Sequence, residues 1–171
     1  ISACLVGSEM CIETGFIGIV GAYASRIVVD PQRLARKPES LTFTQAAAIP
    51  AATLTAWQAL HEHGELRAGQ TVLIHAAAGG VGSAAVQIAK LAGARVIGAA
   101  SAANHDYIRD LGATEVIDYR AGDFARQVSG VDLVLDLVGG DTQSRSWAVL
   151  KPGGILVLSL YTSDAADDMQ C

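Results

Sequence analysis

A glycine-containing turn at residues 77–82, with the sequence AAGGVG, carries the clearest potential for chemistry in this chain. An apolar run at 71–76 precedes it and apolar residues at helical spacing follow it, so the pattern changes from strand to helix across the glycines. Gly79 and Gly82 occupy the second and third glycine positions of a G-x-G-x-x-G turn, with Ala77 in the first. Such a turn lets the backbone approach a pyrophosphate, and the first amides of the helix point at the anion. The sequence therefore predicts a dinucleotide phosphate site formed by Ala78, Gly79, Gly80, Val81 and Gly82.

The residues after the second predicted strand bear on which dinucleotide would bind. In this fold an acidic residue at the end of that strand hydrogen-bonds the ribose 2′-hydroxyl of NAD. Here the sequence has no acidic residue between Gly79 and Ser101. Ser101, Asn104 and His105 can instead donate hydrogen bonds to a 2′-phosphate, close to the start of the next predicted helix. We expect NADPH as the cofactor in preference to NADH; the alternative is that 101–106 is an ordinary helix-capping segment.

Together with several further segments, these residues resemble the medium-chain dehydrogenase/reductase superfamily, and within it the zinc-free, NADPH-dependent quinone oxidoreductase-like branch. The resemblance follows that family's order and spacing over nearly all of residues 17–159. It implies an α/β fold with a Rossmann-type doubly wound parallel sheet, truncated here, and a remnant of a preceding β-barrel-like catalytic domain. The segments that carry it are PESLTFTQAAAIPAATLTAWQAL at 38–60, AAAGGVG at 76–82, LGATEVIDYR at 111–120, VDLVLDLVGGDT at 131–142 and LKPGGILVLS at 150–159.

The resemblance also implies places for further cofactor contacts. It puts Thr55 near the nicotinamide and Tyr119 near the adenosine 2′-phosphate, although a tyrosine that ends a strand commonly serves packing alone. It puts the loop residues Leu137, Val138 and Gly139 near the nicotinamide ribose. Many relatives carry a basic residue at the positions that here read 102–105, and this chain has none there.

The activity that the resemblance implies is hydride transfer from NADPH to a small-molecule quinone or α,β-unsaturated carbonyl. The groups that polarise such a substrate come largely from the preceding domain in this family, so the catalytic residues stay unknown. We expect a cytoplasmic protein whose full-length form is a homodimer. Two alternatives remain open: an enoyl-thioester reductase module of a polyketide-type synthase, and an NADPH-binding protein without turnover.

No metal site is expected within the body of the chain. The three cysteines all lie near the ends, at positions 4, 11 and 171, so the body offers no thiolate for zinc. His61 and His63 are two residues apart at a predicted helix end, a spacing that does not place both on one face. His75 stands where the first strand meets the glycine turn, and we expect a packed polar residue there rather than a ligand or base.

Both ends of the chain look foreign to the family. LVGSEMCI at 5–12 and YTSDAAD at 161–167 resemble translated frames of paired DNA-sequencing adapters. The net charge of −5 arises in these flanks, and residues 14–159 carry equal numbers of acidic and basic side chains. A neutral body gives no reason to expect nucleic acid or an anionic membrane as a partner. The longest apolar stretch is interrupted by glycine, serine and glutamine, which is typical of a buried helix.

The alternation of strand and helix patterns predicts a parallel sheet with right-handed crossovers. We divide the chain into non-native flanks at 1–13 and 160–171, a remnant of the catalytic domain with its linker at 14–37, and an NAD(P)-binding Rossmann domain at 38–159. A short helix capped by Thr44 and a longer one from about Ala51 to Glu62, ended by Gly64, are expected before the sheet. Strands are then expected at 71–76, 95–100, 114–117, 131–136 and 154–159, and helices at 81–92, 104–111, 121–129 and 141–150.

Overall fold

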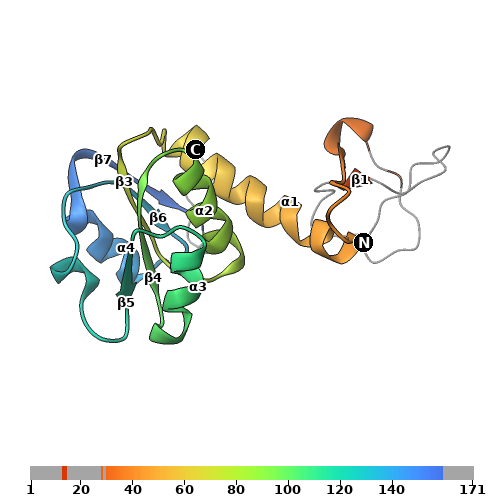
Figure 1. The fold of residues 1–171 in the computed structure, drawn as a ribbon. Helices are drawn as coiled ribbons and strands as arrows, with labels where there is room; N and C mark the ends of the chain where they lie inside the picture. The colour runs from red at the N-terminus through yellow and green to blue at the C-terminus, as the bar shows by residue number, and fades with distance from the viewer. Residues whose placement is uncertain (1–12, 15–27, 29, 160–171) are drawn as a thin grey trace. The chain divides into compact units, whose positions relative to one another are not determined.

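A computed structural model describes residues 13–14, 28 and 30–159 of the chain (Figure 1). The chain divides into two compact units, Ile1–Leu54 and Thr55–Cys171, and each is described by itself. In the first unit β1 (Glu13–Thr14) pairs antiparallel with β2 (Ala35–Arg36), which follows the 3-10 turn η1 (Pro31–Arg33). Both adapter-like runs lie outside the described residues, as do residues 15–27 and 29 of the predicted catalytic-domain remnant.

A single helix stands where the sequence predicted two. Helix α1 spans Phe43–Trp57 and passes through Pro50, so the predicted division was wrong. The proline ring holds a helical φ, and the alanines on both sides are strong helix formers that offset its missing N–H. Thr42, not Thr44, caps the helix: Thr42 Oγ1 accepts from the Gln45 amide at 3.2 Å, and Gln45 Oε1 accepts from the Thr42 amide at 2.9 Å. This reciprocal pair is a capping box.

The helix ends at the predicted residue, although for a different physical reason. It continues into one π-helical segment, η2 (Gln58–His63), followed by Gly64. Gly64 has a φ of −88°, which any residue adopts. A Cβ there would lie 2.7 Å from the Ala59 carbonyl oxygen and 2.8 Å from the Leu133 side chain, so glycine is needed for close packing. The left-handed conformation falls on the next residue, Glu65, with a φ of +46°.

The second unit is built on a five-stranded parallel sheet in the order β5-β4-β3-β6-β7 (Figure 1). The chain starts at the centre, winds outward to one edge, and returns to build the other half. This order confirms the predicted α/β fold with a doubly wound parallel sheet. The strands are β3 (Thr71–Ile74), β4 (Arg95–Ala100), β5 (Glu115–Asp118), β6 (Val131–Asp136) and β7 (Leu150–Leu158). The connecting helices and turns are α2 (Gly80–Leu91), η3 (Ala102–Asn104), α3 (His105–Asp110), η4 (Phe124–Arg126), α4 (Asp141–Ser146) and η5 (Trp147–Val149).

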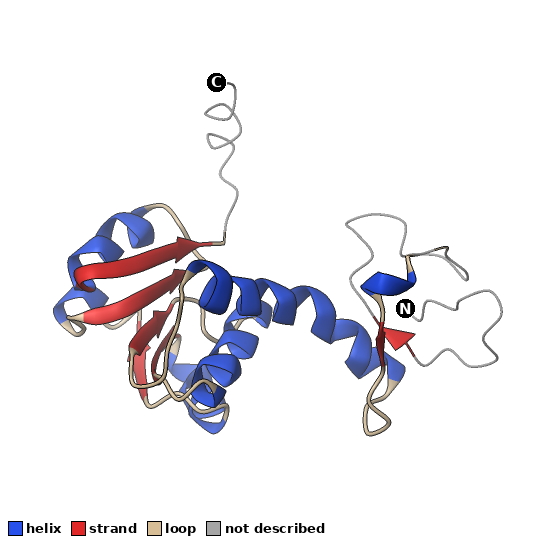
Figure 2. Ribbon diagram, turned by 90° about the horizontal axis from the view of Figure 1, so that it is seen from above, coloured by secondary structure: helices blue, strands red, loops and turns tan. Residues whose placement is uncertain are grey.

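Hydrophobic cores cover both faces of this sheet, and helices flank it on either side (Figure 2). Because successive side chains of a strand point to opposite faces, Val72 and Ile74 of β3 belong to one core and Leu73 to the other. The first core includes Val86 of α2, and the second includes Phe124 of η4. Burial on both faces explains why the central strands are almost wholly apolar.

Several predicted elements differ in extent from the observed ones, and the helix predicted at 141–150 is observed as α4 followed by the 3-10 turn η5. The strand predicted at 71–76 ends at Ile74, because Ala76 already takes a left-handed φ of +49° and turns the chain. The helix predicted at 121–129 was wrong beyond the three residues of η4. There the Asp123 side chain accepts the Ala125 amide at 2.9 Å, a local turn that competes with a longer helix. The last strand begins at Leu150, four residues before its expected start.

Candidate functional site

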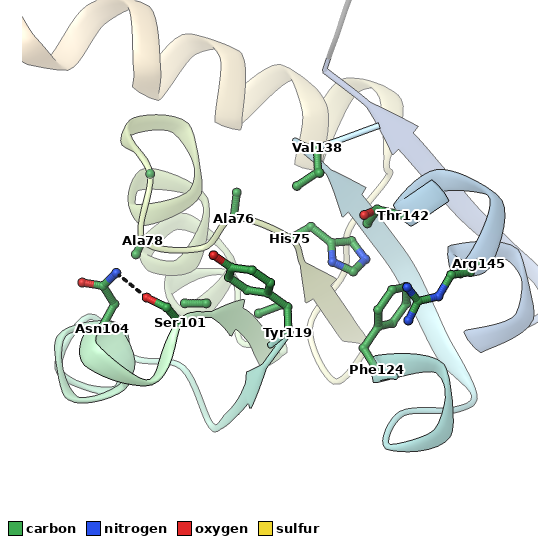
Figure 3. Close-up of a pocket in the computed structure, with 13 residues that line it drawn as sticks. His75, Ala76, Ala78, Ser101, Asn104, Tyr119, Phe124, Val138, Thr142 and Arg145 are labelled. Atoms are coloured by element: carbon green, nitrogen blue, oxygen red, sulfur yellow. Dashed lines mark hydrogen bonds between the residues drawn. The ribbon is translucent and has the colours of Figure 1, made fainter. Parts of the chain in front are cut away.

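A pocket of about 510 Å³ lies at the carboxyl ends of the central strands (Figure 3). The chain leaves β3 toward β4 on one side and later returns to β6 on the other, so this pocket sits at the point where the strand order reverses. Ligands of open α/β sheets bind at such a point. The pocket is lined by His75, Ala76, Ala78, Gly79, Ala99, Ala100, Ser101, Asn104, Tyr119, Phe124, Val138, Thr142 and Arg145.

The structure brings part of the predicted binding set together. The lining residues include six of that set, namely Ala78, Gly79, Ser101, Asn104, Tyr119 and Val138. Thr55 is half-buried on α1 and is not among the lining residues. The other predicted residues that do not line the pocket are Gly80, Val81 and Gly82 in the first turn of α2, His105 at the start of α3, and Leu137 and Gly139 in the loop after β6.

The three glycines of the turn differ in how closely other atoms approach them. Gly82 is the tightest position, because a Cβ there would lie 2.2 Å from the Ala76 carbonyl oxygen. At Gly79 the same oxygen would be 3.2 Å away, and at Gly80 no atom lies within 4 Å. Gly82 therefore permits close approach of helix and turn, whereas Gly79 and Gly80 leave open backbone beside the pocket. The first amides of a helix have no intrahelical acceptor, so this end of α2 suits an anion.

The polar residues after β4 interact mainly with one another. Asn104 Nδ2 donates to Ser101 Oγ at 3.2 Å, within the pocket lining (Figure 3). Neither side chain makes a capping hydrogen bond to the adjoining helical turns, which gives no support to the capping alternative. His105 Nε2 lies 3.3 Å from the Ala100 carbonyl oxygen, a contact that ties this ring to the strand end rather than to the pocket.

The register of β4 and β5 places Ser101 and Tyr119 next to each other in the wall of the pocket. Ala100 pairs with Asp118 across β4 and β5, so Ser101 and Tyr119 follow their strands side by side. The Tyr119 side chain is about half exposed and lines the pocket. Among the described residues that line the pocket, none is acidic, and Arg145 is the one with a permanent charge.

His75 forms a buried polar contact at the floor of the pocket. Its residue is 3% exposed, its Nε2 lies 3.0 Å from Ser146 Oγ, and Ser146 Oγ donates to the Thr142 carbonyl oxygen at 2.7 Å. Burial lowers the pKa of His75 from 6.5 to about 4; the Asp136 carboxylate partly opposes this shift, and the Arg145 charge adds to it. The ring is therefore neutral near pH 7. The expectation of a packed polar residue at this position agrees with these contacts.

Arg145 closes one end of the pocket and was not anticipated from the sequence. Its guanidinium lies 4.6 Å from the Phe124 ring centre and forms an ion pair with Asp123. The hydrogen bond from Arg145 holds the pKa of the Asp123 carboxyl below its usual value. The signal available in the sequence was helical spacing, since Thr142, Arg145 and Ser146 recur at the three- and four-residue intervals of one helix face.

Asp136, at the end of β6, shapes the loop that follows. It is fully buried, and its Oδ1 accepts from the amides of Val138 at 2.8 Å and Gly139 at 3.0 Å. This turn places Leu137 against the core and leaves Val138 half exposed in the pocket wall. Its Oδ2 is the buried side-chain polar atom that lacks a hydrogen-bond partner among the described residues. A buried carboxylate that organises a loop is not recognisable from sequence spacing alone.

No group of three or more histidine, cysteine, aspartate or glutamate side chains in the described part of the chain is arranged to hold a metal ion. Across residues 30–159 and the short described segments before them, no helix is both long and apolar enough to cross a membrane.

Comparison with known proteins places this geometry in a family. Residues 80–163 match the family described as "Zinc-binding dehydrogenase". The quinone oxidoreductase structure from Coxiella burnetii is 44% identical with a TM-score of 0.75, over 81% of this chain and 44% of that one. A synaptic vesicle membrane protein VAT-1 homolog from Danio rerio is 40% identical over 143 residues, and polyketide synthase GfsB from Streptomyces halstedii is 43% identical over 153. The chain belongs to the medium-chain dehydrogenase/reductase superfamily, in its quinone oxidoreductase-like branch.

The match extends over most of this chain and a smaller share of its relatives. It covers 80% of this chain and 30% of the Danio rerio protein, and 88% of this chain and 3% of the polyketide synthase.

Proposed function

We propose that this chain carries the cofactor-binding part of an oxidoreductase that transfers hydride from NADPH to a quinone or an α,β-unsaturated carbonyl. The observation that supports NADPH most directly is the pocket beside the glycine turn, where no described lining residue is acidic. A carboxylate at this place would bind the 2′-hydroxyl of NADH and repel a 2′-phosphate. The hydroxyl of Ser101 and the amide of Asn104 offer donors in its stead.

In this proposal each part of the dinucleotide has its own residues. The pyrophosphate lies against the turn formed by Ala78, Gly79, Gly80, Val81 and Gly82, where the α2 amides point at it. Ser101, Asn104 and Tyr119 hold the 2′-phosphate. His105 can donate a hydrogen bond to it once its ring leaves the Ala100 carbonyl oxygen. The loop Leu137, Val138 and Gly139 carries the nicotinamide ribose, and Thr55 stands near the nicotinamide.

The bound cofactor supplies the hydride, and this chain supplies binding and orientation. Residues 38–159 form the cofactor domain in this account, and 14–37 belong to a catalytic domain with its linker. Because a substrate must be held within hydride reach and its oxygen polarised, a second wall is required. The described residues of the pocket include no acidic side chain that could act as a general acid there.

A second candidate activity is reduction of an enoyl thioester within a polyketide-type synthase. It is favoured by the 43% identity to GfsB, a value close to the 44% identity to the Coxiella burnetii quinone oxidoreductase structure. Both activities use the same cofactor site, so they differ only in the acceptor. Assays of the full parent protein with a quinone and with an enoyl thioester would separate them.

Calorimetric titration of the chain with NADPH and with NADH tests the cofactor proposal. A charge-assisted phosphate contact contributes about 1.5–3 kcal/mol, which corresponds to about ten- to a hundredfold in affinity. We expect NADPH to bind more tightly by that factor, and the double variant Ser101→Ala, Asn104→Ala to lose most of the difference while it still binds NADH. Equal affinities for the two cofactors would contradict the preference for NADPH.

A further inference from the structure

The polar end of the pocket offers hydrogen-bond donors but no permanent positive charge among its lining residues. Ser101, Asn104 and Tyr119 gather there, away from Arg145 at the other end (Figure 3). Arg145 is also engaged by its ion pair with Asp123. A phosphate monoester carries a charge of about −1.5 to −2 at pH 7, and its strongest hydrogen bonds come from cationic donors. A cation that serves the polar end must therefore come from a residue beside the lining.

Arg120 is such a residue, because it directly follows Tyr119 and its side chain lies over the Tyr119 ring. The guanidinium carbon is 5.5 Å from the ring centre, within the range of a cation–π contact. Tyr119 in turn lies beside Ser101, since Ala100 and Asp118 are paired across β4 and β5. The ring contact thus holds a permanent positive charge against a residue of the pocket wall.

The Arg120 guanidinium is available to a ligand. The residue is exposed and has no ion pair in the described part of the chain, whereas Arg109 on α3 pairs with Asp106. The Asp118 carboxylate accepts the backbone amide of Arg120 at 2.9 Å and does not engage its side chain. An arginine whose face contacts an aromatic ring keeps its N–H donors available, because they lie in the guanidinium plane and point outward from its edge. Two of these donors match two oxygens of one phosphate.

We propose that Arg120 is a specificity-determining residue that contacts the 2′-phosphate of NADPH, with the Tyr119 ring positioning its guanidinium. The inference rests on the proposed function, which puts the 2′-phosphate at Ser101, Asn104 and Tyr119. It assigns the cation of this site to the residue that follows Tyr119, in a chain whose segment 102–105 has no lysine or arginine. NADH lacks the 2′-phosphate, so it gains nothing from this charge.

Calorimetry of the whole chain with NADPH and with NADH tests the assignment. Arg120→Gln removes the charge and keeps the backbone amide that Asp118 accepts, so it should weaken NADPH binding about tenfold and change NADH binding less than about twofold. Arg120→Lys keeps the charge without the planar fork and should lose only part of the NADPH affinity. Arg126→Gln is the matched control, because Arg126 is also exposed and without an ion pair but belongs to η4. It should leave both affinities unchanged.

A second measurement guards against variants that do not fold, which melting curves would reveal. In the unmodified chain the preference for NADPH over NADH should fall as salt is added, because ions screen an exposed charge pair. A preference that salt leaves unchanged would overturn the inference alone, as would a folded Arg120→Gln variant that keeps the full preference or an Arg126→Gln variant that loses as much. An unmodified chain that binds NADPH no more tightly than NADH would overturn the cofactor proposal and the inference together.

Discussion

At the scale of single residues, His75 shows how burial sets the chemical state of a side chain. His75 directly follows β3 and is itself buried, so the ring has lost the water that would stabilise its charge. Ser146 satisfies one nitrogen and Phe124 contacts the edge of the ring. The imidazole beside the pocket is therefore neutral at pH 7, and protonating it at lower pH destabilises the folded chain.

The lowered pKa of His75 predicts how the stability of the fold depends on pH. The pKa of His75 is about 4 in the folded chain and 6.5 in its ordinary state, so between these values the unfolded chain binds more protons. Stability should therefore fall as the pH drops from 6.5 toward 4, by about 1.4 kcal/mol per unit from this group. Denaturant unfolding of the chain and of His75→Gln at several pH values measures it. The variant should show a shallower fall, and parallel curves would contradict the assigned cause.

The sequence identified the glycine turn and the polar residues after β4, because both follow from local spacing. It did not identify Arg145, Phe124 or Asp136. Arg145 reaches Phe124 only after α4 and η4 pack on the same face of the sheet. Asp136 acts through two backbone amides of its own loop, a contact that depends on the positive φ of Gly139, +75°. Such residues enter the site by tertiary packing, which a linear pattern does not encode.

At the scale of elements, the approach of α2 to the turn before it depends on the small size of one residue. Gly82 and Gly80 share the first turn of the helix but differ in their surroundings. A Cβ at Gly82 would meet backbone at 2.2 Å, whereas at Gly80 it would meet open space. The same substitution at the two positions therefore changes helix propensity equally, whereas its effect on packing differs.

We therefore expect opposite effects from the same substitution. Gly82→Ala should lower the free energy of unfolding by about 2–3 kcal/mol or more, because rigid backbone must move to relieve the overlap. Gly80→Ala should change it little or raise it by up to about 1 kcal/mol through helix propensity. Chemical denaturation of both variants measures the difference. Similar values for the two would show that α2 does not pack on the turn as described.

The accuracy of the predicted elements varied with how strongly each depends on its neighbours. The strands at Arg95–Ala100 and Val131–Asp136 were predicted with the observed limits, because apolar runs bounded by glycine and polar residues define them locally. The length of the helix near 121–129 was overestimated, since an aspartate side chain and flanking glycines favour turns. The length of helix α1 was underestimated because proline is uncommon inside a helix. Here the surrounding residues offset the loss of helix stability that proline causes.

At the scale of the whole molecule, the pocket supplies a place for the cofactor and only part of what turnover requires. The chain spans 44% of the Coxiella burnetii enzyme's length in the solved structure. We predict that it binds NADPH yet shows no reduction of a quinone or enone, because a misplacement of about 1 Å can cost a hundredfold in rate. NADPH oxidation followed by absorbance, with and without a preceding domain from the parent gene, measures this. Turnover by the 171-residue chain alone would contradict the two-domain account.

The central claim is that a dinucleotide binds with its pyrophosphate against the glycine turn. Calorimetric titration with NADPH of the chain and of its Gly79→Val variant tests this claim most directly, with melting curves of both as the folding control. A side chain at Gly79 would occupy the space beside the α2 amides, although its Cβ would meet the Ala76 carbonyl oxygen at a tolerable 3.2 Å. The account predicts binding to the chain and none to a folded Gly79→Val variant. Equal binding by both, or no binding by the chain, would contradict it.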